Sequence, residues 1–202
     1  MKKFIVFGTS KSIDDNVYYR KERLKMWGSL YLAGVIPTYW ESNIEFEKNA
    51  NREFAKKHGF DFYDIVPFIE SNDKEIIKRL VNSDKNCIPE IISQLKAILN
   101  TETLHLIFNG KTSFYFFTYF LIENNIDENS FNTHKRKLKK AFDELTTSYG
   151  EIDNQFFLKN SINFDSNKKI YILPNTSSRS LNGFDEFTWI NTLKNIKQIE
   201  KK

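Results

Sequence analysis

The chain has 202 residues, a formal net charge of +4 and a single cysteine, Cys87. A chain of this length forms one ordinary domain with a substantial core, and one cysteine excludes an internal disulfide framework. The apolar run 4–7 is too short for a signal peptide, and no stretch approaches the roughly 18 apolar residues of a membrane helix. We therefore expect a soluble, cytoplasmic protein with no membrane partner. Its mild positive charge is compatible with a polyanionic partner.

Four short apolar segments predict β-strands, because each is rich in branched or aromatic residues and ends at turn formers. They span 4–7, 59–66, 104–108 and 170–173. Helical spacing of apolar residues predicts helices over 19–34, 44–58, 74–82, 88–99, 112–124 and 185–198, with a further helix around 135–148. Strands that alternate with helices indicate a parallel sheet covered on both faces. We therefore expect a single domain over 1–202, an α/β fold with three α/β/α layers and a four-stranded parallel sheet, interrupted by a polar insertion over 127–167.

The predicted strands end in polar loops. Gly8-Thr9-Ser10 follows the first strand, Asn109-Gly110-Lys111 the third, and Asn175 to Ser178 comes after Pro174 at the end of the fourth. Parallel strands bring their carboxyl ends to one edge of the sheet, where open α/β folds place their ligand sites. A strand-to-helix connection without function is the simpler interpretation of each loop taken alone.

Five segments in order along the chain resemble the uracil-DNA glycosylase superfamily, and most closely its hypoxanthine-specific and mismatch-specific branches. The segments are Phe7 to Ser10; Tyr18-Tyr19 leading to Met26-Trp27-Gly28 and Ala33-Gly34; Tyr63 to Val66; Phe108 to Lys111; and Leu173 to Ser177. The resemblance implies a four-stranded parallel sheet between helices, hydrolytic removal of a base from DNA, and no cofactor.

The sequence departs from the family at the position that orients the attacking water. The family's first motif often carries Asn or Asp two residues after its Gly, where this chain has Ser10. The hypoxanthine branch instead carries an Asn three residues before the Trp of the first helix, and here that residue is Leu24. Lys11 replaces the family's Pro. Either another residue positions water or the activity is lost.

Hydrolysis of an N-glycosidic bond builds positive charge on the sugar, so a carboxylate near the anomeric carbon would stabilise it and orient water. Asp14 and Asp15 lie between the first strand and the tyrosine pair, and Glu22 opens the first helix. We prefer Asp15 because it is nearer the tyrosines, and Ser10 completes the catalytic candidates. Turn formation is the ordinary role of Asp14 and Asp15, and solvent exposure in a first helical turn that of Glu22.

Base recognition is expected of Asn109, whose amide offers both donors and an acceptor to a base edge. A turn residue before Gly110 is the alternative. Tyr18 or Tyr19 could stack on a flipped base, although one of the two is expected in the core. Gly8 and Thr9, at the end of the first strand, complete the base-binding candidates.

DNA contacts are expected from hydroxyl, amide and basic groups. The polar loop after the fourth strand can grip phosphates, Arg179 could enter the minor groove, and basic side chains could contact further phosphates. These candidates are Asn175, Thr176, Ser177, Ser178, Arg179, Lys111, Lys135, Arg136 and Lys137. Plain solvent exposure is the alternative for Arg179 and for the 135–137 cluster. Three scattered histidines and one cysteine predict no metal site.

The sequence thus favours a monomeric DNA glycosylase that acts on duplex DNA with a flipped nucleotide. Uracil, hypoxanthine and a bulkier modified pyrimidine, such as a modified base of viral DNA, are its candidate substrates. DNA repair and anti-phage defence are the corresponding roles. Two alternatives remain open, a catalytically silent nucleic-acid-binding module and an enzyme of free nucleosides. Leu24 and Ser10 favour the silent module, whereas the basic cluster counts against the nucleoside enzyme.

Overall fold

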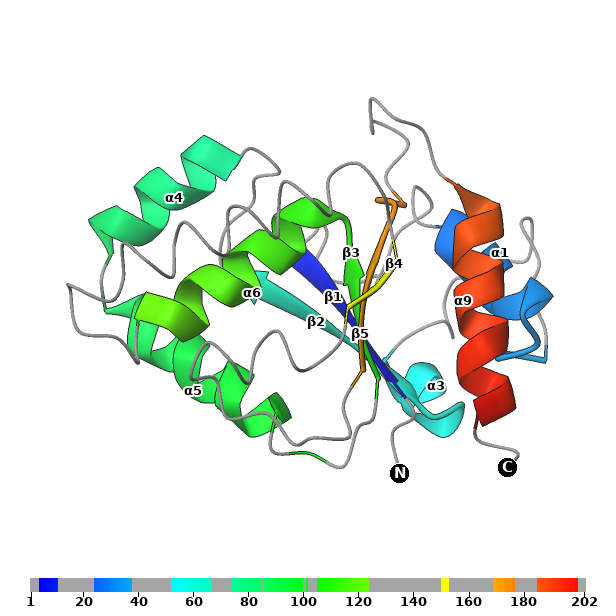
Figure 1. Cartoon of the computed structure of the whole chain (residues 1–202). Coiled ribbons are helices and arrows are strands. Elements are labelled where there is room, and N and C mark those ends of the chain that lie inside the picture. The colour runs from blue at the N-terminus through cyan, green and yellow to red at the C-terminus, as the bar shows by residue number, and fades with distance from the viewer. Residues whose placement is uncertain are drawn as a thin grey trace.

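The computed structural model describes residues 4–10, 24–37, 52–66, 74–84, 86–99, 101, 105–123, 150–152, 169–176 and 185–199. Five strands form one sheet in the order β2-β1-β3-β5-β4 (Figure 1). They are β1 (Phe4–Ser10), β2 (Phe60–Val66), β3 (His105–Asn109), β4 (Gly150–Ile152) and β5 (Lys169–Leu173).

The strands β2, β1, β3 and β5 pair in parallel, which confirms the predicted four-stranded parallel sheet. The short strand β4 adds an antiparallel edge next to β5, with Gly150 opposite Ile172 and Ile152 opposite Ile170. The sequence analysis assigned this region to the polar insertion and missed the strand, because three residues with one apolar side chain carry no alternation to detect. The helix expected around 135–148 lies outside the described residues.

Six helices are described: α1 (Leu24–Leu32), α3 (Arg52–Lys57), α4 (Lys74–Ser83), α5 (Cys87–Leu99), α6 (Lys111–Glu123) and α9 (Glu186–Ile199). Each falls within or next to a predicted helix. The helix α1 stops where predicted, because Gly34 adopts a positive φ of 71° and Pro37 follows. Residues 19–23 and 44–51, which the prediction also made helical, lie outside the described residues.

The sheet is the middle of three layers, with α4, α5 and α6 on one side and α1, α3 and α9 on the other (Figure 1). Alternation along β1 divides the core accordingly. Ile5 and Phe7 pack with the first helix layer, and Phe4 and Val6 pack with the second. Successive side chains of a strand point to opposite faces, so a strand that is apolar throughout must be covered twice.

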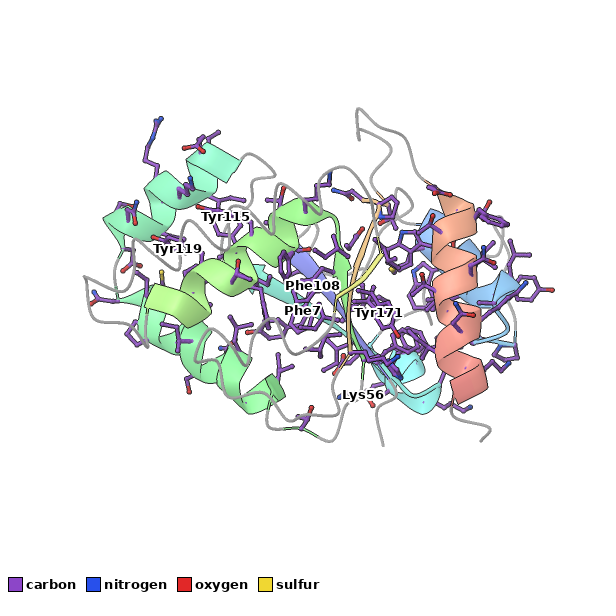
Figure 2. All side chains as sticks on the ribbon, in the orientation of Figure 1. Phe7, Lys56, Phe108, Tyr115, Tyr119 and Tyr171 are labelled. Atoms are coloured by element: carbon purple, nitrogen blue, oxygen red, sulfur yellow. The ribbon has the colours of Figure 1, made fainter. Side chains whose placement is uncertain are left out.

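Aromatic rings fill the first of these cores (Figure 2). Phe7 of β1 stacks on Phe108 of β3 with 4.8 Å between ring centroids. Phe117 of α6 meets Phe108 edge-on at 4.7 Å and Phe7 at 5.5 Å. Because Phe7 and Phe108 immediately precede the polar ends of their strands, this cluster fixes the position of both ends.

In the second helix layer, α1 packs against α9, the last described helix of the chain. Trp27 and Leu30 of α1 share a core cluster with Trp189 and Leu193 of α9. The Lys197 ammonium donates a 2.6 Å hydrogen bond to the carbonyl of Gly34, and so provides a partner for the carboxyl end of α1.

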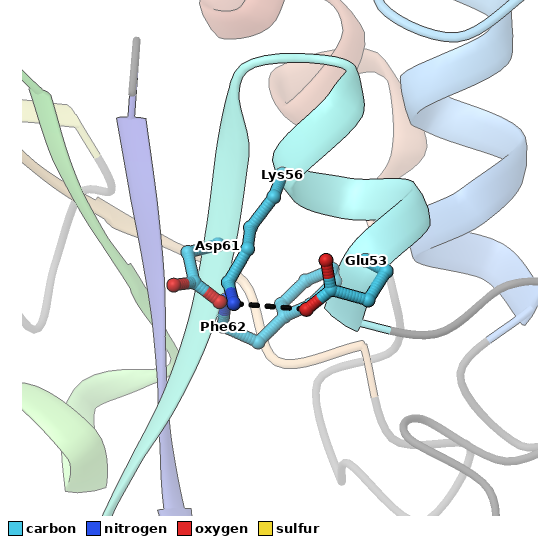
Figure 3. Close-up of polar contacts among 4 residues, drawn as sticks. All are labelled: Glu53, Lys56, Asp61 and Phe62. Atoms are coloured by element: carbon cyan, nitrogen blue, oxygen red, sulfur yellow. Dashed lines mark hydrogen bonds and ion pairs between the residues drawn. The ribbon is translucent and has the colours of Figure 1, made fainter. Parts of the chain in front are cut away.

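The edge strand β2 begins beside α3 (Figure 3). Lys56 of α3 forms an exposed ion pair with Glu53 at 3.0 Å, a type of contact that contributes about 0–1 kcal/mol. Asp61 of β2 is buried, and its carboxylate accepts a 2.9 Å hydrogen bond from the Phe62 N–H. An inward carboxylate of this kind discourages an edge strand from pairing with another chain.

Replacing Phe108 by Ala should destabilise the protein by about 3–5 kcal/mol, because it removes a fully buried ring from a stacked cluster. Urea denaturation measures the loss. Phe187→Ala is the matched control, since its ring is 75 % exposed and its removal should change the free energy of unfolding by less than about 0.5 kcal/mol. Equal losses for the two variants would contradict the packing described here.

Candidate functional site

The strand order identifies the place where a ligand site is expected. The strands β1 and β3 are neighbours at the centre, while the chain passes from β1 to β2 on one side and returns to β3 on the other. In open α/β sheets, ligands bind at such a switch point, outside the carboxyl ends of the two strands. Gly8 and Thr9 lie at that end of β1, and Asn109 and Gly110 lie at that end of β3.

Asn109 binds the chain segment that leaves β5. Its Nδ2 donates to the hydroxyl oxygen of Thr176 at 3.0 Å, and its Oδ1 accepts from the N–H of Thr176 at 2.9 Å. Both side chains are buried, at 6 % exposure for Asn109 and 0 % for Thr176. Two hydrogen bonds in a low-dielectric setting hold this pair in one geometry.

Gly110 makes the next contact between the same two strand ends. Its N–H donates to the carbonyl of Leu173 at 2.9 Å, and its φ of 89° lies in the left-handed region that favours glycine. A Cβ on this residue would stand 3.1 Å from the Cβ of Asn175. A glycine here therefore allows Asn175 to lie directly over the end of β3, where Asn175 is exposed.

Trp189 of α9 holds the segment after β5 from the side of the sheet that α1, α3 and α9 cover. Its indole N–H donates to the carbonyl of Pro174 at 2.7 Å, and the ring is fully buried. Residues 174–176 are thus fixed by Asn109 and Gly110 from β3 and by Trp189 from α9. The sequence analysis missed Trp189, whose only signal was its place on the apolar side of the last predicted helix.

The helix α9 begins with a capping residue. The Asp185 carboxylate accepts from the N–H of Thr188 at 3.1 Å and also from the Thr188 hydroxyl. These hydrogen bonds favour the ionised form and hold the pKa of Asp185 below its ordinary value. The cap sets the point at which α9 begins.

Lys111 is the first residue of α6 and stands directly after Gly110. Partial burial lowers the pKa of Lys111 from its ordinary value. A lysine at a helix amino terminus adds its charge to the positive end of the helix dipole, which is unfavourable for the helix alone and favourable for a bound anion. The Ser113 hydroxyl donates to the Gly110 carbonyl at 2.8 Å and fixes this first turn.

Six of the candidate site residues lie together at this edge: Gly8, Thr9, Asn109, Lys111, Asn175 and Thr176. Ser10 ends β1 opposite Val66, and only its backbone is described. The remaining candidates lie outside the described residues; they are Asp14, Asp15, Tyr18, Tyr19, Glu22, Ser177, Ser178, Arg179, Lys135, Arg136 and Lys137.

His105 is buried at the amino end of β3, opposite the candidate edge, with its Nδ1 3.5 Å from the Tyr171 hydroxyl. Among the described residues, no three His, Cys, Asp or Glu side chains gather closely enough to hold a metal ion. Of the helices that the structure describes, none has both the length and the apolar character needed to cross a membrane.

No model of a known protein family matches the chain, and no curated protein matches its sequence significantly. The resemblance to uracil-DNA glycosylases therefore depends on the order and spacing of the five sequence segments, three of which contribute residues to this edge.

Gly110→Ala should destabilise the protein by about 1–3 kcal/mol, because alanine is strained at this φ and its methyl group would displace Asn175. Thermal unfolding measures the loss, and amide NMR shifts of Asn175 and Thr176 report the displacement. Gly59→Ala is the matched control for backbone strain alone, since Gly59 has a similar φ of 83° but lies in the turn between α3 and β2. Unchanged shifts of Asn175 in the Gly110 variant would contradict the close approach.

Proposed function

We propose that the chain is a DNA glycosylase that hydrolyses the N-glycosidic bond of a damaged or modified base. The observation that carries the proposal is the convergence of three polar strand ends, from β1, β3 and β5, at the switch point of a parallel sheet. These three ends are also segments of the resemblance to uracil-DNA glycosylases. Uracil, hypoxanthine and a bulkier modified pyrimidine are the candidate bases, with repair or anti-phage defence as the corresponding role.

Removal of a base requires that the nucleotide leave the helical stack, which takes a few kcal/mol and places the base in a pocket of the enzyme. The region outside the carboxyl ends of β1 and β3 is the proposed pocket, with Gly8 and Thr9 on one side. Tyr18 or Tyr19 would stack on the flipped base. Asp15, or otherwise Asp14 or Glu22, would orient the attacking water and stabilise the cationic sugar.

Phosphate contacts would come from groups around the same edge. Lys111 stands at the amino terminus of α6, where its charge and the helix dipole both favour an anion. Asn175 is exposed beside it over Gly110. Ser177, Ser178 and Arg179 follow in sequence and would extend these contacts along the DNA, whereas the burial of Thr176 favours a supporting role for that residue.

A catalytically silent DNA-binding module is the second candidate function. Ser10 and Leu24 occupy the two positions at which the family carries its water-positioning residue, and neither is an Asn or an Asp. Such a module would bind and flip a nucleotide without releasing the base.

Cleavage of defined oligonucleotides tests both functions. Duplexes that carry uracil, hypoxanthine, hydroxymethylcytosine or its glucosylated form are incubated with the protein and then treated with alkali, which breaks the strand at abasic sites. We expect abasic product from one of them, and Asp15→Asn should lower the single-turnover rate by about a hundredfold or more with DNA affinity nearly unchanged. Binding to these duplexes without abasic product would establish the silent module instead. Parental rates for both Asp14→Asn and Asp15→Asn would direct the search to Glu22.

DNA affinity should fall steeply with salt, because each phosphate contact releases counterions and adds about 0.9 to the slope of log affinity against log salt. Replacing Lys135, Arg136 and Lys137 together by Ala should reduce that slope by about 0.9 for each contact removed. Fluorescence anisotropy of a labelled duplex between low and moderate salt measures both slopes. An affinity that does not change with salt would count against DNA as the partner.

A further inference from the structure

We propose that Asn109 is a positioning residue, which acts on the substrate through Thr176 instead of reading the base with its own amide. The inference rests on the proposed glycosylase function and assigns Asn109 a role different from the base recognition expected from sequence. It concerns the two hydrogen bonds that join the end of β3 to the segment after β5.

The first argument is that the amide edge of Asn109 is already occupied. To read a base, an amide presents its oxygen and one N–H side by side to a matching donor and acceptor. In the structure that pair of atoms meets the N–H and hydroxyl oxygen of a single residue, Thr176, at 2.9 Å and 3.0 Å. A base could take the same edge only by breaking both hydrogen bonds and leaving buried groups of Thr176 without them.

Burial gives a second argument. Asn109 is 6 % exposed and Thr176 is 0 % exposed, so neither presents an open surface to a base. Asn175 between Pro174 and Thr176 is exposed, whereas its two neighbours are buried. The segment is therefore built to hold its two flanking residues and to present the one between them.

The third argument is that the segment has a second, independent anchor. The Trp189 indole donates to the carbonyl of Pro174 at 2.7 Å, so Pro174 is held from α9 while Thr176 is held from β3. Asn109 and Trp189 thus fix the backbone on both sides of the exposed Asn175. A small displacement of such a segment can lower an enzymatic rate by about a hundredfold.

Four variants separate positioning from base reading: Asn109→Ala, Thr176→Val, the double variant and Thr176→Ser. Valine keeps the shape of threonine but removes the hydroxyl that Asn109 binds, whereas serine keeps that hydroxyl. Single-turnover rates are measured on the best substrate and on a second base that the parent protein also releases. Urea denaturation of all four variants is measured in parallel, so that the link between Asn109 and Thr176 is also tested by a measurement that does not depend on catalysis.

If Asn109 acts through Thr176, Asn109→Ala and Thr176→Val should each lower the rate by about tenfold or more, and the double variant should be within about threefold of the slower single variant. The ratio of rates on the two bases should stay constant, and Thr176→Ser should recover most of the rate that Thr176→Val loses. A changed ratio in Asn109→Ala, or effects that multiply in the double variant, would overturn the proposal.

The unfolding data distinguish this proposal from the proposed function. Coupling between the two substitutions of about threefold or more in the unfolding equilibrium constant is expected whether or not a base is released. Coupled unfolding together with no abasic product and no DNA binding would reject the glycosylase and retain the link between Asn109 and Thr176. Independent unfolding effects would reject the link itself, whatever the activity.

Discussion

The pair of hydrogen bonds between Asn109 and Thr176 is the constraint on which the candidate site depends. It closes the gap between the end of β3 and the chain leaving β5, two segments that are neighbours only because the sheet places β3 beside β5. The stacked rings of Phe7 and Phe108 directly precede the polar ends of β1 and β3. They pack against Phe117 and so fix both strand ends against α6. Packing therefore sets where the strands end, and directional hydrogen bonds set how the chain continues from there.

The candidate site combines buried residues that are held by hydrogen bonds with side chains that are available to a ligand. Pro174 and Thr176 are buried and are held by Trp189 and Asn109 respectively, whereas Asn175 is exposed and Lys111 begins a helix beside it. A site that must accept an extruded nucleotide benefits from this division, because pre-organised groups lose little entropy when the ligand binds. The resemblance to uracil-DNA glycosylases gives the arrangement its proposed reaction.

Much of the fold could be predicted from the sequence, and the reasons are local. The apolar run 170–173 ends at Pro174, where β5 also ends, and the intervening helices show regular apolar spacing, whereas β1 continues past the run 4–7 to Ser10 because it pairs with β2. The strand β4 could not be predicted, because Gly150-Glu151-Ile152 is held by its partner β5 and not by any pattern of its own. The sequence also indicated that Asn109 lies at the shared edge. Its partner could not be found in this way, since 67 residues separate the two and their meeting depends on strand register.

The packing of α1 against α9 has a consequence for the order in which the molecule can be assembled during synthesis. The helix α9 follows the five described strands, yet its Trp189 and Leu193 complete the core that Trp27 and Leu30 begin. The core between the sheet and α4, α5 and α6 can be completed once β5 has been made, because Ile170 and Ile172 of β5 are the last residues of that cluster in the chain. The opposite face of the sheet stays only partly covered until α9 emerges, and during this interval Phe4, Val6 and Ile107 lack part of their final packing. A chain that lacks α9 therefore exposes apolar surface on one face of the sheet. Exposed surface of this kind makes folding intermediates prone to aggregate.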